Sequence, residues 1–241
     1  MSAEVSPPPV LAMTEVEASY GPFRALFDVS FRIGPGEAIG LLGANGAGKT
    51  AVARVAGGLL PPTAGTVVVD GVDMGGENAY KFARAGVAHA PEGRSVFATF
   101  TVEENLALSF RRALGRSGVK SGLSRAFEIF PRLGERRSQL AGTLSGGEQR
   151  MLSLARVMVE EPRLLIADEL SLGLAPIIIE EVYKVLHSIR QAGTSLLVVE
   201  QHATHALSLC DRIVVLDHGR VVWEGPSDEA LGAIESSLFK G

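Results

Sequence analysis

Gly43-Ala44-Asn45-Gly46-Ala47-Gly48-Lys49-Thr50 fits the pattern G-x-x-x-x-G-K-[ST] and is called the P-loop below. Residues 37–42 before it, which are apolar after Glu37, predict a short strand, and residues 51–56 after it predict a helix. In such a turn, glycines let backbone N–H groups point into one nest, and the following helix adds its positive end. Lys49 supplies a cation, and the Thr50 hydroxyl can hold Mg2+. The stretch therefore predicts a site for a nucleoside triphosphate.

Composition narrows the class of protein around this site. The chain has 241 residues, of which 46% are hydrophobic, and its net charge is -4. This length suits one large α/β domain or two small ones with a sizeable core. Basic residues form no stripe, so no nucleic-acid partner is expected. The single cysteine, Cys210, excludes an internal disulfide and a CxxC metal site, and we expect a buried side chain there.

Neither the apolar runs nor the N-terminus predicts membrane insertion. The runs are shorter than the roughly 18 to 20 residues that span a bilayer. Residues 1–10 contain three successive prolines and lack the basic start and apolar stretch of a signal peptide. We therefore expect a mobile leader followed by a cytoplasmic protein.

Alternating apolar and polar residues predict two half-buried strands over 11–20 and 26–33, and residues 66–70 predict another. We expect these early strands to pair antiparallel. Tyr20, at the end of the first, can stack on a purine ring or fill the edge of the small sheet, and periodicity does not separate the two.

Residues 86–100 run from a short strand into a loop that mixes charged and aromatic residues. Thr101 is a predicted N-cap, with Glu103 and Glu104 in the first turn, and the pattern is mainly helical from there to about residue 160. Phe97 and Phe100 are packing residues by default, and a partner-facing role is the alternative.

A second glycine-containing turn, Leu144-Ser-Gly-Gly-Glu-Gln149, precedes an amphipathic helix. Ser145 is a predicted N-cap. Because Ser-Gly-Gly at a helix start offers free N–H groups, this turn can bind an anion or merely cap the helix.

Two buried strands are predicted to end in polar side chains. Residues 162–169 end in Asp168, which can reach the shell of Mg2+, and Glu169, which can face a water that attacks a γ-phosphate. Residues 195–199 are followed by His202, placed where a γ-phosphate contact is feasible. Beyond them, residues 212–217 and 220–224 predict a hairpin around His218-Gly219, and residue 226 onward predicts a terminal helix.

Taken in this order, the P-loop, the Leu-Ser-Gly-Gly-Glu-Gln segment, the Asp-Glu strand end and the strand-end histidine resemble the ATP-binding subunit of an ATP-binding cassette (ABC) transporter. The resemblance covers the chain from about residue 11 to the end. It implies an α/β P-loop NTPase cassette with a mainly parallel core sheet, an N-terminal antiparallel β subdomain and an inserted helical subdomain. The implied divisions are a leader over 1–10 and one ATPase domain over 11–241, with 11–92 and 161–241 as the core and 93–160 as the helical part.

The resemblance also assigns roles. It implies stacking of adenine on Tyr20 and catalysis by Lys49, Glu169 and His202. Magnesium would be held by Thr50, Glu92 and Asp168. The residues implied to hold ATP are Tyr20, Gly43, Asn45, Gly46, Ala47, Gly48, Lys49, Thr50 and Ala51, together with Ser145, Gly146, Gly147 and Glu148 acting on the ATP of a facing subunit. Two homologous or identical subunits would then form a head-to-tail dimer around two ATP molecules.

The segments Pro91-Glu-Gly-Arg94 and Asp168-Glu-Leu-Ser-Leu-Gly-Leu-Ala-Pro176 are most similar to the LivF-type ATPase of branched-chain (hydrophobic) amino-acid importers. This implies a peripheral protein on the cytoplasmic face of the inner membrane. Its Glu92–Phe100 region would contact permease subunits, and an external substrate-binding protein would act indirectly. Urea or amide importers and the lipopolysaccharide exporter share much of the pattern, and a soluble non-transport ABC ATPase is the rival from another class.

Four positions depart from the wider family pattern. Glu92 replaces a glutamine that contacts Mg2+, and Ala51 replaces a hydroxyl residue after Thr50. Leu170 stands at a usual proline position and Leu174 at a usual aspartate position. Ala51 bears on one phosphate hydrogen bond, Glu92 on the affinity for the metal and Leu174 on signalling between subunits.

Overall fold

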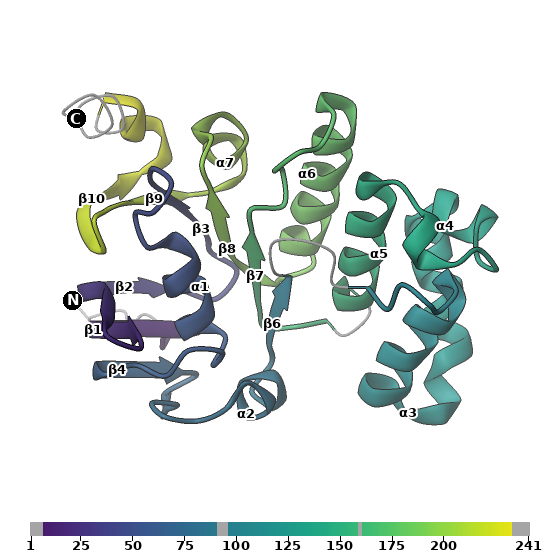
Figure 1. Cartoon of the computed structure of the whole chain (residues 1–241), viewed down its shortest axis with the longest axis horizontal. Coiled ribbons are helices and arrows are strands. Elements are labelled where there is room, and N and C mark those ends of the chain that lie inside the picture. The colour runs from purple at the N-terminus through teal and green to yellow at the C-terminus, as the bar shows by residue number, and fades with distance from the viewer. Residues whose placement is uncertain (1–6, 91–95, 159–160, 233–241) are drawn as a thin grey trace, which may run out of the picture. The chain divides into compact units, whose positions relative to one another are not determined.

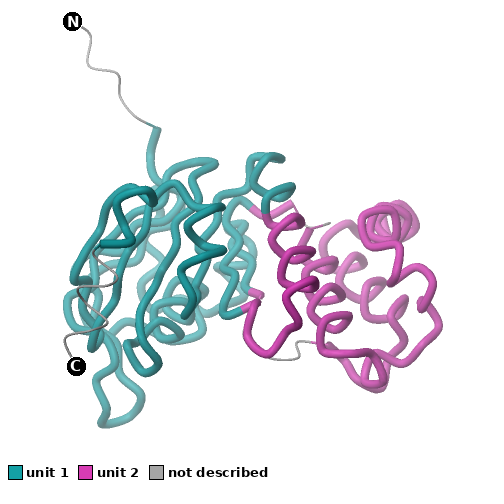
Figure 2. The backbone as a smooth tube through the Cα atoms, turned by 90° about the horizontal axis from the view of Figure 1, so that it is seen from above, with its two compact units in different colours: residues 1–89, 163–169, 187–241 teal, residues 90–162, 170–186 magenta. Residues whose placement is uncertain are grey.

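A computed structural model describes residues 7–90, 96–158 and 161–232. The chain forms two compact units (Figure 2). Unit 1 comprises residues 1–89, 163–169 and 187–241, and unit 2 comprises residues 90–162 and 170–186. The P-loop and both strand-end carboxylates belong to unit 1, whereas Ser145 to Glu148 belong to unit 2.

The early strands of unit 1 form a four-stranded antiparallel sheet in the order β2-β1-β4-β5, as predicted (Figure 1). Its strands are β1 Leu11–Tyr20, β2 Phe23–Ile33, β4 Ala64–Val69 and β5 Val72–Asp73. Leu11 pairs with Ile33 on one side and Val69 on the other, and all three side chains are buried. The period-two pattern therefore sets both the register and the buried face.

The second sheet of unit 1 has six strands in the order β10-β9-β3-β8-β7-β6. They are β3 Ala38–Leu42, β6 Val87–Ala90, β7 Leu164–Asp168, β8 Ser195–Glu200, β9 Arg212–Asp217 and β10 Arg220–Pro226. Strand β3 pairs parallel with β8 and β9, and β7 pairs parallel with β8, whereas β10 is antiparallel. Every residue of β3, β7 and β8 is buried, as continuous apolar strands of a parallel sheet require.

Helix α1 Lys49–Ala56 packs on strands of both sheets, and its apolar residues join the same core. It ends at Gly57, and Gly58 follows with a φ of 69°. Helices α2 Ala79–Arg84 and α7 Ala203–Leu209 complete unit 1 together with the adjoining end of α6 Pro176–Gln191.

Unit 2 is helical, as predicted for residues 101–160. It contains α3 Val102–Ile129, α4 Pro131–Glu135, the 3-10 turn Ala141–Thr143 and α5 Gly146–Met158. Thr101 caps α3 in a reciprocal box with Glu104, and α3 breaks at Gly115, where φ is 73° and ψ is 177°. Because α3 breaks at Gly115, this unit consists of several helical segments and not of one straight helix.

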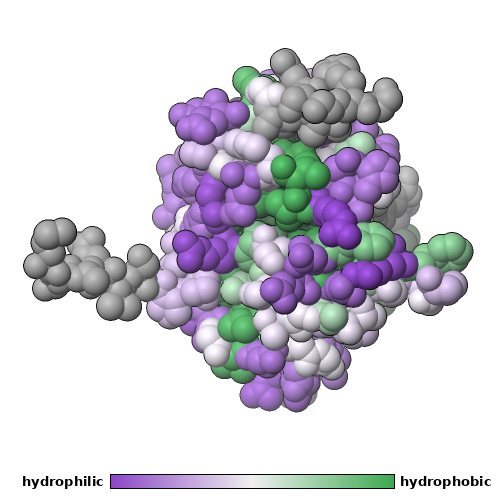
Figure 3. Space-filling view, turned by 90° about the vertical axis from the view of Figure 1, so that its left-hand side faces the viewer, coloured by the Kyte–Doolittle hydropathy of each residue, from purple (hydrophilic) through white to green (hydrophobic). Residues whose placement is uncertain are grey.

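The predicted hairpin is confirmed: β9 and β10 pair antiparallel around His218 and Gly219, which both have positive φ. Side chains of β10 alternate in exposure, and Val222 is half exposed. On that side of the molecule, hydrophobic residues gather within a hydrophilic surface (Figure 3). A 3-10 turn, Ser227–Glu229, starts the predicted terminal helix, whose residues 233–241 lie outside the described part.

None of the described helices combines the length and apolar character needed to cross a bilayer.

Candidate nucleotide-binding site

The P-loop follows β3 and opens α1 through two glycines with left-handed backbone, Gly46 with φ 81° and Gly48 with φ 105°. Side chains disfavour that conformation, so the motif needs glycine there. Gly43 is needed for another reason, because a Cβ at this position would lie 2.3 Å from the Leu216 carbonyl oxygen. No side chain caps α1 within the described structure. Its N-terminal amides therefore lack a side-chain cap, and the positive end of the helix favours an anion.

Lys49 is buried at the start of α1, and its relative exposure is 4%. Its Nζ donates hydrogen bonds to the carbonyl oxygens of Gly43 at 3.0 Å and Ala44 at 3.1 Å. The same Nζ lies 3.4 Å from Oε1 of Glu169. The protein's own oxygens thus hold this cation.

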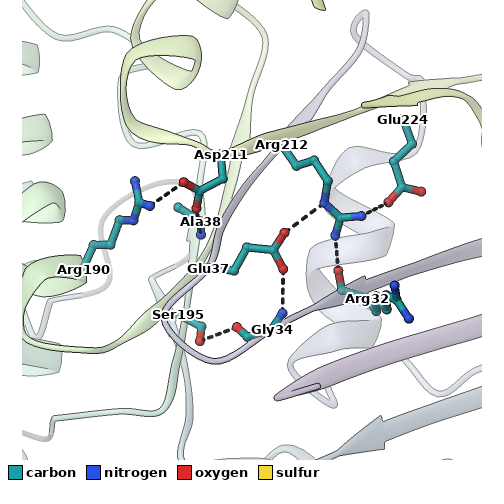
Figure 4. A network of polar contacts seen from close by, with 9 residues as sticks. All are labelled: Arg32, Gly34, Glu37, Ala38, Arg190, Ser195, Asp211, Arg212 and Glu224. Atoms are coloured by element: carbon teal, nitrogen blue, oxygen red, sulfur yellow. Dashed lines mark hydrogen bonds and ion pairs between the residues drawn. The ribbon is translucent and has the colours of Figure 1, made fainter. Parts of the chain in front are cut away.

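The start of β3, at the end opposite the P-loop, is fixed by a polar network (Figure 4). Arg212 on β9 donates to Glu37 Oε1 at 2.9 Å, to Glu224 and to the Arg32 carbonyl. Asp211 accepts from the Ala38 amide at 3.0 Å. These charge-assisted bonds join β2, β3, β9 and β10, so the strand that carries the P-loop is held at its base.

Asp168 and Glu169 follow one another at the end of β7, as predicted, but their environments differ. The Asp168 side chain is only 1% exposed, and its Oδ1 has no hydrogen-bond partner among the described residues. Glu169 has a φ of 47°, and its amide donates to the Val199 carbonyl at 2.8 Å. A buried carboxylate oxygen without a donor suits a cation, so the chemistry of Asp168 fits a Mg2+ ligand. Thr50 is half-buried, and its part in holding Mg2+ stays a prediction.

A further side chain at this site, His89 on β6, was missed by the sequence reasoning. Its Nε2 lies 3.7 Å from Oδ2 of Asp168, and the side chain is 10% exposed. The signal that could have revealed it is a single histidine among the apolar residues of a short strand, Val87–Ala90, whose two ends are buried. Polar groups at such places need a partner, which draws attention to the neighbouring strand end.

Three other predicted site residues of unit 1 are less buried or face the core. Tyr20 is 40% exposed at the end of β1, and the Arg54 guanidinium of α1 lies 5.7 Å from its ring centroid. His202 is exposed directly after β8, at the N-cap of α7. The Ala51 side chain is buried in the core, so its backbone alone is able to face a ligand.

The signature segment, Ser145 to Glu148 of unit 2, forms a capping box at the start of α5. The Ser145 amide donates to Glu148 Oε2 at 2.9 Å, and the Glu148 amide donates to Ser145 Oγ at 3.3 Å. Burial raises the pKa of Glu148, but the Ser145 bonds and the charges of Arg136 and Arg132 outweigh it and hold that pKa below its usual value. Gly147 packs close to Ile178, and a Cβ at Gly146 would meet nothing within 4 Å. The capping alternative is thus realised, and anion binding by this segment stays a prediction.

Phe97 and Phe100 are 47% and 40% exposed, and their ring centroids lie 5.5 Å apart. Buried Asn105 holds this loop: it accepts from the Phe97 amide at 2.8 Å and donates to the carbonyls of Phe97 and Phe100. The aromatic pair is therefore presented at the surface of unit 2 by a fixed backbone. Glu92, predicted to contact Mg2+, lies outside the described residues.

Known proteins resemble this chain over most of its length. Residues 26–171 match the model of the ABC transporter family. BraG of Pseudomonas aeruginosa, a high-affinity branched-chain amino acid transport ATP-binding protein, is 41% identical over 88% of this chain and 91% of its own. The lipopolysaccharide export ATP-binding protein LptB of Haemophilus influenzae is 29% identical over 92% of both chains. A solved ATP-binding subunit of an ABC transporter superposes with a TM-score of 0.81 at 27% identity, over 95% of this chain and 93% of its own.

The chain therefore belongs to the ABC transporter family. Within it, the chain is an ATP-binding subunit, an ATPase whose hydrolysis of ATP is coupled to transport. The predicted cassette fold is confirmed, with its antiparallel β sheet, mainly parallel core sheet and helical insert.

Proposed function

We propose that this chain is the ATPase of an importer for branched-chain or other hydrophobic amino acids. The observation that carries the proposal is its 41% identity to BraG over nearly the full length of both proteins. The sequence contains the P-loop, both strand-end carboxylates and the signature segment, and their presence supports an active ATPase.

In the proposed mechanism, Lys49 exchanges its bonds to Gly43 and Ala44 for bonds to the β- and γ-phosphates of ATP. Thr50 and Asp168 would hold Mg2+, and the ion would neutralise charge on the phosphate oxygens. Glu169, released from Lys49, orients the attacking water and accepts its proton. His202 braces the γ-phosphate from the end of β8, and Tyr20 stacks on adenine.

The mechanism needs a second subunit. Ser145, Gly146 and Gly147 would complete the site of a facing subunit, identical or homologous, in a head-to-tail dimer, with Glu148 holding their helix start. Permease subunits would dock on the loop around Phe97 and Phe100, whose exposed aromatic pair supports this role. The protein would then work at the cytoplasmic face of the membrane.

Lipopolysaccharide export is the second candidate, favoured by the full-length similarity to LptB at the lower identity of 29%. The two candidates differ in cargo, and cargo is chosen by other subunits of the assembly.

The test is purification of the chain from membranes with its native partners, followed by reconstitution. We expect leucine, isoleucine or valine, with the external binding protein, to raise ATP hydrolysis several-fold. A complex carrying Glu169→Gln is the matched control, because it should assemble without turnover. Stimulation by lipopolysaccharide and none by amino acids would replace import with export.

A further inference from the structure

His89 lies on β6, the strand beside β7 in the six-stranded sheet (Figure 1). Its side chain is 10% exposed, and neither ring nitrogen has a hydrogen-bond partner in the described part of the chain. The nearest carboxylate is Asp168, whose Oδ2 lies 3.7 Å from Nε2. Two buried polar groups, the imidazole and Oδ1 of Asp168, are therefore left incomplete at one place.

The end of α1 lies close to the imidazole. An ideal Cβ built on Gly57 would lie 3.4 Å from Nδ1, which is an ordinary van der Waals distance. Gly57 also provides the C-cap of α1. Helix α1, which starts at the P-loop, thus ends beside His89. His89 in turn lies next to Asp168, the carboxylate predicted to bind the metal.

The separation of 3.7 Å is an ion-pair distance, longer than a hydrogen bond. A closer approach by about 0.7 Å would make an ordinary N–H···O bond. Burial strongly favours that bond, because an imidazole N–H and a carboxylate oxygen away from water gain most from meeting each other. The bond would also fix which oxygen of Asp168 remains for a cation.

We propose that His89 is a positioning residue for the metal site: its Nε2–H binds Oδ2 of Asp168 when a divalent cation arrives and holds Oδ1 toward that cation. The inference rests on the proposed role of Asp168. Groups that orient a metal ligand typically change metal affinity about 10- to 100-fold when removed. His89 therefore acts on the affinity for Mg2+, not on the affinity for ATP itself.

The test compares side chains of one shape that differ in hydrogen bonding. His89→Gln keeps an N–H donor. The methionine of His89→Met has nearly the same size and shape as that glutamine but carries no N–H donor. Both are made in a Glu169→Gln background, so that hydrolysis does not disturb the equilibrium. ATP binding is measured by calorimetry in EDTA and at increasing Mg2+ concentrations.

We expect all variants to bind ATP in EDTA with the affinity of the parent within about twofold. The Mg2+ concentration for half-maximal tightening should rise about tenfold in His89→Met and stay within about threefold of the parent in His89→Gln. Equal behaviour of the two variants, or an equal loss of affinity in EDTA, would overturn the inference. His89→Asn and His89→Leu form a second matched pair and decide the question if the first pair does not fold.

Two controls separate this inference from the proposed function. His187→Leu changes an exposed histidine that contacts Gln191 and should leave the Mg2+ dependence unchanged. Asp168→Asn should abolish that dependence. If Asp168→Asn responds to Mg2+ like the parent, the proposed metal site and the His89 inference both fail; if it loses the response and His89→Met does not, only the His89 inference fails.

Discussion

The starts of α1 and α5 both contain glycine, but they satisfy their N-terminal amides differently. At α1, Gly48 adopts a left-handed backbone, no side chain among the described residues caps the helix, and the buried Lys49 follows. At α5, Ser145 and Glu148 form a reciprocal box, and the carboxylate of Glu148 lies against the helix N-terminus. Thr101 and Glu104 do the same at α3.

This difference distinguishes a helix N-terminus that is suited to a ligand from one whose own cap stabilises the fold. A capped helix start has its own carboxylate and is stable without a ligand. An uncapped start gains more when an anion binds, because its amides have no side-chain acceptor of their own. We infer that the P-loop supplies most of the affinity for ATP, and that the signature segment acts on a site already occupied.

Removing the cation should produce the largest effect. In Lys49→Ala, the phosphates lose their buried positive partner, so we expect ATP affinity and turnover each to fall on the order of 100-fold or more. Calorimetry and a phosphate-release assay measure the two. Lys81→Ala, which removes an exposed lysine paired with Glu77, is the matched control and should change neither. Parental ATP affinity in Lys49→Ala would break the distinction between the two helix starts.

A methyl group added to each glycine turn should have a smaller and unequal effect on stability. Gly43→Ala places Cβ against the Leu216 carbonyl, so we expect a loss of about 1–3 kcal/mol in the free energy of unfolding. Gly146→Ala meets open space in this structure, and its Tm should stay within about 1 °C of the parent. Thermal unfolding of both variants checks this, and equal losses would contradict the packing difference.

Sequence pattern predicted most of this fold because the patterns are local. Each pattern depends on residues close together in the chain. The alternation in 11–20 and the continuous apolar strands indicate which strand faces are buried, and the Thr101 cap marks one helix start. The P-loop and both strand-end carboxylates were found for the same reason.

What pattern did not predict depends on contacts between distant residues. His89 meets Asp168 only because β6 and β7 are neighbours in the sheet. Arg212 likewise joins Glu37 and the Arg32 carbonyl, far from it in the chain. Glu148 was predicted to touch ATP, whereas its carboxylate is already engaged by Ser145 and Arg136. Whether it also touches ATP stays a prediction.

Loss of the Glu148 carboxylate at the capped start of α5 should have a small, pH-dependent effect on thermal stability. Since the pKa of folded Glu148 lies below its ordinary value of 4.5, its carboxylate stabilises the fold fully above that value. This contribution is lost as pH falls through the lowered pKa. Glu148→Gln keeps an acceptor oxygen but removes the negative charge at the helix N-terminus, so it should lower Tm by about 1–3 °C at neutral pH in a chain of this size. The gap from the parent should close in acid, and a gap that widens in acid would reverse the assignment.

Unit 1 is proposed to carry an ATPase site in which Glu169 activates water. Its most direct test is Glu169→Gln, measured for ATP binding and for phosphate release in the same preparation. We expect ATP affinity within about threefold of the parent and turnover reduced by at least about 100-fold. Phosphate release near the parental rate would contradict it.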